Sequence, residues 1–503
     1  MIIMNKIFLI VLALGIYCHN AELYSQVSTN YLFSQSQGTY QEITGDTIVA
    51  SATHTSIDPF QLNDVTYNTN HLPFIFKFNG INYTDFKINS NGFITFGSTP
   101  PVQTNYGPIS SSESYERVVS AFGQNLIGVF GTTADFVSTT FILTNVANFK
   151  GVVAGRHITA ATGIKADTYI VSFDTTLKTI TLSKPTDDII VTGLVIQIAA
   201  GSIVRSTEGT APYRVHTIQF KNFRQFLIIG TDDNFNFQIK LYETSGVIKV
   251  VYGNMNEITS SGIFGQVGLR GNVNTDFNNR TNSVSLDWAA STAGTANAAT
   301  SKLSSSLFPV SGQTYIWSPV PVSLNISFIQ EAFYNPVSEK LNLTDTVNIY
   351  LRNNTSPYNL VDSAEGLLDS STLTANVIFN NANSGTYYIQ VNHRNCIETW
   401  SKSGGEIITA GITNYNFTSL QTRAYGSNEI QVDASPVRFA IYSGDVNQDG
   451  TIDLTDGSLI DNDASNFATG YLPTDVNGDW IVDVADAVFA DNNAFNFISK
   501  ITP

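Results

Sequence analysis

The chain has few cysteines and few basic residues. It contains 2 cysteines and 3 methionines among 503 residues, and 25 lysines and arginines stand against 41 acidic residues. Cys18 lies in an amino-terminal segment that we expect to be removed, so Cys396 would remain alone and no disulfide would form within the chain. Such a lone cysteine inside a strand is expected to be a small buried apolar residue. The net charge of −16 repels nucleic-acid phosphates and argues against a nucleic-acid partner.

Sequence motifs of several enzyme classes are also missing. The 6 histidines are scattered, and neither an H-E-x-x-H motif, a G-x-S-x-G motif nor a P-loop occurs. His393 and Arg394 are expected to be an exposed pair on a strand. A glycoside hydrolase stays open as an alternative because it needs only two carboxylates, and the candidates are Asp232, Asp233, Glu243 and Asp287.

The first 26 residues are typical of a secretion signal. Lys6 supplies a positive charge, and an apolar run follows from Ile7 to Tyr17. This run is short for a membrane span, although a membrane anchor is the alternative interpretation. A lipoprotein site at Cys18 would follow "GIY", which fits poorly. We therefore expect a secreted, extracellular or cell-surface protein with no stable membrane span after cleavage.

The remaining sequence favours a mainly β fold. Phe74, Phe76 and Phe78 alternate with more polar positions, as in a strand with one buried face. Asn79-Gly80, Asn91-Gly92 and Ser245-Gly246 are hairpin turn signals. In the hairpin around Ser245-Gly246, Phe237, Ile239 and Leu241 are expected to point to the core.

The order of these patterns predicts tandem β-sandwich domains followed by a small helical domain. The first sandwich is expected over residues 27–318, with a small β module, rich in Thr, Val and Ile, inserted at about 135–203. Prolines 319 and 321 stiffen a short linker. The second sandwich is expected over 322–440 and the acidic carboxyl-terminal domain over 441–503.

The acidic domain contains a duplicated loop. From Gly444 to Pro503 there are eleven aspartates, no glutamate and a single basic residue, Lys500. The segment from Asp445 aligns with that from Asp475 at a shift of thirty residues, and eleven of twenty-five positions are identical. Both copies carry acidic or amide side chains at positions 1, 3, 5, 9 and 12, which is the spacing of calcium loops.

Two calcium sites are therefore predicted, because a divalent cation needs six to eight oxygens and would neutralise the crowded carboxylates. The backbone carbonyl would serve at position 7, and Ile452 and Val482 at position 8 are expected to pair with each other. Trp480 replaces the glycine of position 6, so the second site is expected to be weaker, or its loop adjusted. The expected ligands are Asp445, Asn447, Asp449, Thr451, Asp453 and Asp456 in the first loop, and Asp475, Asn477, Asp479, Ile481, Asp483 and Asp486 in the second.

The duplicated loop and helix resemble a type I dockerin module. This resemblance implies two bound calcium ions and docking onto a cohesin-like or other cell-surface protein. At loop positions 10 and 11 the chain has Leu454-Thr455 and Val484-Ala485, where dockerins often have small hydroxyl residues. The alternative is that the module packs against the preceding domain, which contains the "HRNCIETW" segment.

The strand "YYIQVNHRN" and the segment from Leu72 to Gly97 resemble modules of secreted proteins from Bacteroidetes and related phyla. The resulting hypothesis is a secreted, calcium-binding, non-catalytic protein for binding or assembly. The alternative is a carbohydrate-active protein, either a sugar-binding module or a glycoside hydrolase, carried on a dockerin. For the alternative, Trp288, Trp317 and Tyr242 would stack on sugars, although such residues also pack in cores.

Overall fold

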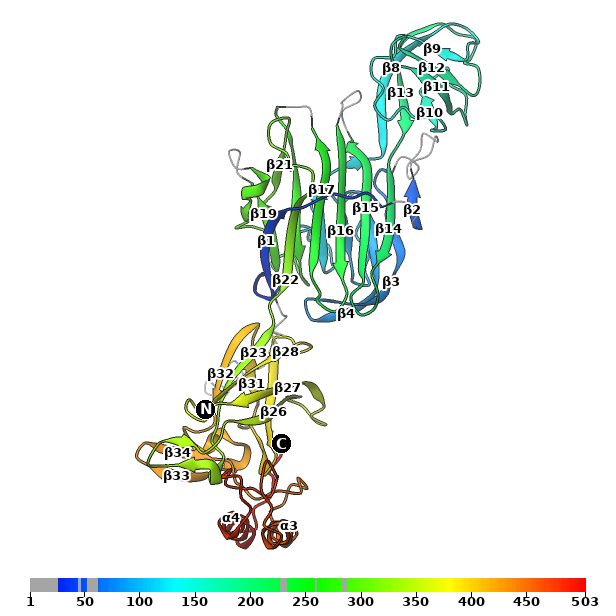
Figure 1. Ribbon diagram of the computed structural model, residues 1–503. Helices are drawn as coiled ribbons and strands as arrows, with labels where there is room; N and C mark the ends of the chain where they lie inside the picture. Colours follow the sequence, from blue (N-terminus) through cyan, green and yellow to red (C-terminus); the bar gives the residue numbers. More distant parts are fainter. Residues whose placement is uncertain (1–25, 44–46, 52–61, 227–232, 258–259, 283–286) are drawn as a thin grey trace, which may run out of the picture. The chain divides into compact units, whose positions relative to one another are not determined.

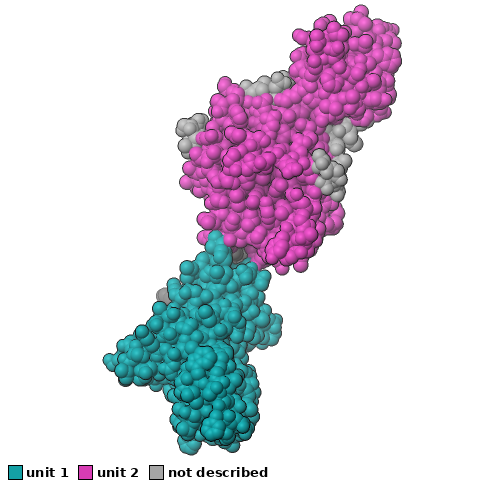
Figure 2. Space-filling view, viewed as in Figure 1, with its two compact units in different colours: residues 1–25, 320–503 teal, residues 26–319 magenta. Residues whose placement is uncertain are grey.

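The computed structural model describes residues 26–503, except 44–46, 52–61, 227–232, 258–259 and 283–286 (Figure 1). The predicted signal segment and Asp232 lie outside the described residues. The chain divides into two compact units, Gln26–Pro319 and Val320–Pro503, which are coloured separately in Figure 2. Both are mainly built from β-sheets, so the predicted fold class is confirmed at this level.

The first unit contains two large antiparallel sheets. One has the order β1-β22-β17-β16-β15-β14-β2, with β7 paired to β15, and the other has the order β20-β19-β18-β6-β5-β4-β3, with β21 paired to β18. The strands of the first sheet are β1 (Tyr31–Gln37), β2 (Thr47–Ser51), β7 (Leu126–Ile127), β14 (Ser202–Glu208), β15 (Val215–Gln225), β16 (Asn234–Tyr242), β17 (Ile248–Asn256) and β22 (Gln313–Pro319). Those of the second are β3 (Thr66–Phe78), β4 (Ile81–Asn89), β5 (Phe93–Thr95), β6 (Val118–Gly123), β18 (Ile263–Arg270), β19 (Phe277–Thr281), β20 (Thr292–Ala293) and β21 (Ser301–Leu303). Two short helical segments are α2 (Val27–Asn30) and η1 (Trp288–Ala290).

The two sheets share one core, as in a β-sandwich. Phe74, Phe76 and Phe78 are buried while Ile75 is 62% exposed, so the predicted alternation is confirmed. Phe237, Ile239 and Leu241 of the other sheet join the same core. Trp288 and Trp317 are also fully buried in it, so their indole rings pack in the core and are unavailable for stacking on a sugar.

All three predicted hairpin turns are confirmed, and Asn91-Gly92 lies in the turn between β4 and β5. β3 and β4 are joined by Asn79 and Gly80, whose φ angles of +46° and +88° are the left-handed conformation that a tight hairpin turn requires. β16 and β17 are joined through the turn containing Ser245 and Gly246. These turns fix the strand register and hence which side chains face the core.

The segment expected to be inserted has a core of its own. Its strands form two three-stranded sheets, β10-β13-β8 and β11-β12-β9, and buried residues from Ala134 to Ile198 form a separate cluster. The strands are β8 (Val129–Phe136), β9 (Ile142–Leu143), β10 (Ile158–Ala160), β11 (Ile170–Asp174), β12 (Thr179–Leu182) and β13 (Val191–Ala199) (Figure 1).

The second unit combines small sheets with two helices. Its sheets are β28-β23-β32, β27-β26-β29-β30 with β31 paired to β29, and the pairs β24-β25 and β33-β34. The strands are β23 (Val322–Ser327), β24 (Tyr334–Asn335), β25 (Lys340–Leu341), β26 (Asp345–Asn353), β27 (Leu360–Leu368), β28 (Thr374–Phe379), β29 (Gly385–His393), β30 (Cys396–Trp400), β31 (Glu406–Ile408), β32 (Gly411–Asn416), β33 (Ile430–Ala434) and β34 (Val437–Ala440). The helical segments are η2 (Glu331–Phe333), η3 (Gln421–Arg423), η4 (Tyr425–Ser427), α3 (Leu454–Ser465) and α4 (Val484–Phe495).

Candidate metal centre

The first acidic loop winds tightly around its own side-chain oxygens. Asn447 Oδ1 accepts a hydrogen bond from the Asp449 N–H at 2.8 Å, and Asp449 Oδ1 accepts one from Thr451 at 3.0 Å. Asp445 Oδ2 accepts from the Gly450 N–H at 3.2 Å, and Gly450 has φ +90°. A left-handed residue at this point suits glycine and lets the loop reverse. The side chains at positions 1, 3 and 5 are thereby held within one turn of backbone.

Asp456 closes the same loop from the first turn of α3. Its side chain is fully buried, and Oδ1 accepts from the backbone N–H groups of Val446 and Asn447 at 2.9 and 3.1 Å. Its Oδ2 accepts from the Asp453 N–H at 3.0 Å, while Asp453 caps the helix through Thr455. This reciprocal capping box ties position 12 to position 9 and to the start of the loop.

One oxygen of the first loop lacks a partner. Asp445 is 1% exposed, and its Oδ1 is buried without a hydrogen bond. Burial, followed by repulsion from Asp456 and Asp449, raises the pKa of Asp445 to about 7. Burial also raises the pKa of Asp456. A buried carboxylate oxygen without a hydrogen-bond partner is costly, and a cation beside it would remove that cost. The side-chain oxygens of this loop are of the type that a hard divalent cation prefers.

The second loop repeats the scaffold with two differences. Asn477 Oδ1 accepts from Asp479 at 2.8 Å, and Asp486 Oδ1 accepts from Asn477 at 2.9 Å. Both oxygens of Asp475 accept backbone hydrogen bonds, including one from Trp480 at 3.3 Å. Trp480 adopts φ +74°, so the indole residue takes the left-handed conformation that glycine has in the first loop. This conformation costs a non-glycine residue about 1–2 kcal/mol.

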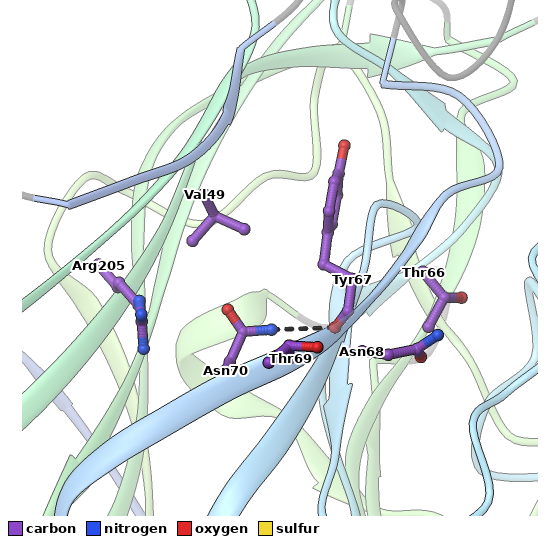
Figure 3. A pocket seen from close by; sticks show the side chains of 7 residues that line it. All are labelled: Val49, Thr66, Tyr67, Asn68, Thr69, Asn70 and Arg205. Carbon is purple, nitrogen blue, oxygen red and sulfur yellow. Dashed lines mark hydrogen bonds between the residues drawn. The ribbon is translucent and has the colours of Figure 1, made fainter.

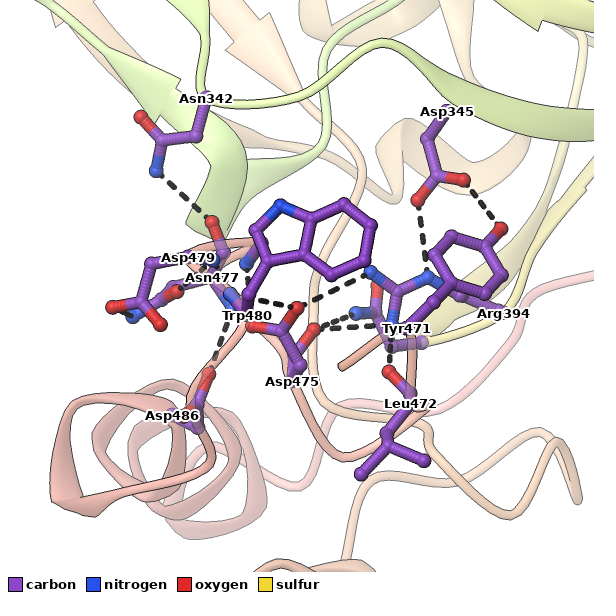
Figure 4. Close-up of polar contacts among 12 residues, drawn as sticks. Asn342, Asp345, Arg394, Tyr471, Leu472, Asp475, Asn477, Asp479, Trp480 and Asp486 are labelled. Carbon is purple, nitrogen blue, oxygen red and sulfur yellow. Dashed lines mark hydrogen bonds and ion pairs between the residues drawn. The ribbon is translucent and has the colours of Figure 1, made fainter. Parts of the chain in front are cut away.

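A guanidinium group forms the second difference (Figure 4). Arg394 Nη2 lies 3.8 Å from Asp475 Oδ2, and Arg394 Nη1 donates to the Leu472 carbonyl and, at 3.2 Å, to the Asp475 carbonyl. Burial raises the pKa of Asp475, and the positive charge of Arg394 opposes that rise. Part of the charge that a cation would supply at the second loop is therefore already supplied by the chain.

The "HRN" segment holds the acidic repeat against the β domain. Asn395 Nδ2 donates to the Asp475 carbonyl at 2.9 Å, and Arg394 Nε donates to Asp345 Oδ2 at 3.0 Å. His393 Nε2 lies 2.9 Å from the same Asp345 oxygen, and the Tyr471 hydroxyl donates to Asp345 Oδ1. We call these residues of β26, the β29–β30 turn and the acidic repeat the HRN anchor. It makes the β domain and the repeat parts of one compact unit.

The prediction of an exposed His393–Arg394 pair is wrong. His393 is 2% exposed, and the Arg394 side chain is 11% exposed. Burial alone would raise the pKa of Asp345, but hydrogen bonding and charge from His393, with Tyr471 and Arg394, hold it well below its usual range. The Arg394 guanidinium also lies over the Tyr471 ring, 4.4 Å from its centroid. Sequence reasoning missed these partners because they are separated from the "HRN" strand by 48 to 81 residues.

The expected pairing of Ile452 with Val482 is also wrong. The Ile452 N–H donates to the Ile498 carbonyl at 2.9 Å, and the Val482 N–H donates to the Ala468 carbonyl at 3.0 Å. Each loop thus pairs with the segment that follows the helix of the other repeat. This arrangement lets both position-8 side chains enter the shared core under the helices, where Ile452 and Val482 are 1% and 2% exposed.

The twelve predicted ligands thus lie in two loops, and the structure does not gather them into a closed cage. Within the described residues, no group of three or more His, Cys, Asp or Glu side chains is arranged to hold a metal ion. Most carboxylate oxygens of the loops accept backbone hydrogen bonds, and Asp453 and Asp483 act as helix caps. Asn amide oxygens and backbone carbonyl oxygens, which are also calcium ligands, would have to complete each set of ligands.

The carboxylates considered for a hydrolase have other surroundings. Glu243 pairs with Arg214 through Oε1 at 2.6 Å and through Oε2 at 2.8 Å. Asp287 is exposed beside η1, and Asp233 is fully buried. Cys396 is fully buried as predicted, and burial raises the pKa of its thiol far above the usual range.

Comparison with known proteins identifies the first unit. The model of the NIDO-related family matches residues 30–140 and 159–319, which is more than half of the chain. The chain therefore belongs to the NIDO-related family. The interval between the two matched ranges falls in the segment expected to be inserted. A search of curated proteins finds no match.

Two similar solved structures are mutants of a type II cohesin–X-dockerin complex from Acetivibrio cellulolyticus. The C-terminal interface mutant is 12% identical, with a TM-score of 0.22, and the match covers 35% of this chain and 99% of that one. The N-terminal interface mutant is 15% identical, with a TM-score of 0.21, and the match covers 35% and 97%. These scores are too low to establish a shared fold. No helix among the described residues is long and apolar enough to cross a membrane.

Proposed function

We propose that the protein is a secreted, non-catalytic binding or assembly protein whose carboxyl-terminal repeat is a calcium-stabilised, dockerin-like docking module. The observation that carries the proposal is the buried, unpartnered Oδ1 of Asp445 inside a loop where most of the other acidic oxygens accept hydrogen bonds from backbone N–H groups. A carboxylate in this position is destabilised unless a cation joins it.

Calcium would supply charge neutralisation and cross-linking of loop oxygens, and no reaction is assigned to it. Asp445, Asn447, Asp449, the Thr451 carbonyl and Asp456 would hold it in the first loop. The corresponding residues from Asp475 to Asp486 would hold a second ion more weakly. Arg394 already places a positive charge beside Asp475, and Trp480 has the left-handed backbone conformation that is costly for a non-glycine residue. Asp453 and Asp483 would serve directly or through water.

The HRN anchor defines how such a module would work in this chain. Hydrogen bonds from Arg394 and Asn395 fasten the Asp475 end of the second loop to the β domain. The β domain and repeat would therefore act as one binding unit. Leu454 and Val484, at position 10 of the two loops, are 82% and 75% exposed and remain free to meet a partner. A cohesin-like or other cell-surface protein is the proposed partner.

Titration calorimetry of the mature full-length protein with calcium tests the metal proposal. We expect two binding events, the tighter of which is abolished or weakened at least tenfold in Asp445→Asn. Asp461→Asn is the matched control, because this exposed aspartate lies on α3 outside the loop. Absence of calcium binding in the wild-type protein would refute the metal proposal. Pull-down of partners from the native culture, with and without calcium, tests the docking proposal separately.

The carbohydrate-active protein, a sugar-binding module or a glycoside hydrolase, stays the alternative proposal. A hydrolase would need two carboxylates facing one cleft, and among the described candidates Glu243 is engaged by Arg214. A polar hollow in the first unit is the proposed binding site for a glycan partner.

A further inference from the structure

A polar hollow lies at one open edge of the first unit (Figure 3). It has a volume of about 420 Å³ and lies between β3 of one sheet and β14 and β2 of the other. Arg205 and Val49 face Asn70 and Tyr67 across it. We call it the β3–β14 hollow; its lining residues are Val49, Thr66, Tyr67, Asn68, Thr69, Asn70 and Arg205.

Arg205 is the cation of this hollow. Its Nη1 donates to the His71 carbonyl at 2.7 Å, which bridges the two sheets. Its Nε is buried and has no hydrogen-bond partner. Across the part of the chain that the structure describes, no carboxylate lies within ion-pair distance of Arg205. A partly buried guanidinium normally has an anionic partner, so this group is available to a ligand.

A second hollow of about 280 Å³ adjoins the first and shares Arg205 with it. His216 lines this second hollow and is 3% exposed. Its Nδ1 lies 2.8 Å from Thr207 Oγ1, while its buried Nε2 has no partner. Burial, followed by the charge of Arg205, lowers the pKa of His216 to about 4. His216 is therefore neutral at pH 7 and is not a second cation beside Arg205, and its unpartnered Nε2 is buried.

The other lining groups match the chemistry of a sugar. Asn68 and Thr69 are exposed, so their amide and hydroxyl groups can exchange hydrogen bonds with ligand hydroxyls. The half-buried Tyr67 lines the hollow while packing against the sandwich core, and Asn70 is fixed by its own hydrogen bond to the Tyr67 carbonyl at 2.9 Å. Amide and hydroxyl side chains at a concave site exchange hydrogen bonds with the several hydroxyls of a pyranose ring.

We propose that the β3–β14 hollow binds a carboxylate-bearing sugar of an acidic polysaccharide, with the carboxylate on Arg205 and the ring hydroxyls on the Asn and Thr side chains. A guanidinium fork matches a planar carboxylate through two parallel hydrogen bonds. The site lies in the first unit and does not depend on the calcium proposal, so each can fail without the other. The described residues that line the two hollows include no carboxylate.

Titration of the full-length protein with trigalacturonate, followed by calorimetry in the presence of chelator, tests this site. We expect saturable binding with a Kd in the millimolar range or tighter. Fully methyl-esterified trigalacturonate keeps the rings and removes the charge, so it should bind at least tenfold more weakly. Arg205→Gln should reduce affinity for the acidic trimer by about tenfold or more, which corresponds to the loss of one charge-assisted contact. Lys165→Gln, an exposed charge removal outside both hollows, is the matched control and should change nothing.

Two further arms separate the outcomes. Asn68→Ala changes an exposed side chain and is expected to weaken binding of the trimer without lowering the melting temperature, which keeps the test valid if Arg205→Gln unfolds. Acetate alone should bind far more weakly than the trimer, since it offers no ring. The proposal is overturned if the trimer does not bind, if the methyl ester or a sulfated neutral trimer binds as well, or if Asn68→Ala and Arg205→Gln both keep wild-type affinity while folded.

Discussion

Removing the Arg394 side chain is expected to release the acidic repeat from the β domain. Arg394 joins Asp345 to the carbonyls of Leu472 and Asp475 and lies over the Tyr471 ring. The Asp345 side chain is 1% exposed, so Arg394→Ala leaves a buried carboxylate with fewer partners. Breaking a buried pair on one side costs about 3–5 kcal/mol. Arg394→Lys keeps the positive charge and loses the several N–H donors of the planar guanidinium group, so a loss of about 1–3 kcal/mol in stability is expected.

Hydrogen exchange followed by mass spectrometry measures this cost where it occurs. A loss of about 3 kcal/mol corresponds to an exchange rate more than 100-fold faster for amides that open with the anchor. The effect should concentrate in peptides covering residues 468–486. Arg438→Ala is the matched control, because its pair with Glu339 is 3.9 Å long and partly exposed and should contribute at most about 1 kcal/mol. Unchanged protection of the second loop in Arg394→Ala would show that the anchor does not hold it.

Three further changes probe the loops and a buried acid. Asp445→Asn should weaken calcium binding yet leave the melting temperature in chelator unchanged or raised, because the substitution removes a buried charge whose Oδ1 has no hydrogen-bond partner; calorimetry and thermal melts check both parts. Trp480→Gly should bring the second calcium affinity closer to the first by removing about 1–2 kcal/mol of left-handed strain, and an unchanged ratio in calorimetry would contradict this. Glu429 has two buried oxygens without partners, and burial raises its pKa to about 9 from 4.5, so stability should fall as pH rises across that interval. Glu429→Gln should therefore raise the free energy of unfolding of the second unit, measured in urea, by about 1–3 kcal/mol at pH 8 and not at pH 4. Glu365 is exposed, so Glu365→Gln should leave the free energy of unfolding unchanged at both pH values.

The parts of the fold that depend on neighbouring residues were predictable. The alternation around Phe76 and the turns at Asn79-Gly80 and Ser245-Gly246 follow from side-chain period and local backbone preference, and the structure confirms them. The left-handed backbone expected at loop position 6 occurs at both Gly450 and Trp480.

The parts that depend on distant contacts were not predictable. The sequence predicts that Ile452 and Val482 pair with each other. Each instead pairs with the segment that follows the helix of the other repeat, and the packing of α3 against α4 decides this pairing. His393 and Arg394 carry polar side chains on a strand, which favours exposure, and a distant aspartate reverses that preference. The β3–β14 hollow combines strands from two sheets, so no local motif indicates it.

Whether the acidic repeat binds calcium is decided by calcium titration of the full-length mature protein, followed by calorimetry at neutral pH. We expect two sites of unequal affinity and a higher melting temperature of the second unit when both are filled. The tighter site should be lost in Asp445→Asn and kept in Asp475→Asn. Absence of binding heat in the wild-type protein would contradict calcium binding by the repeat. Unchanged binding heat in both Asp445→Asn and the equivalent Asp475→Asn would contradict the assignment of the two loops.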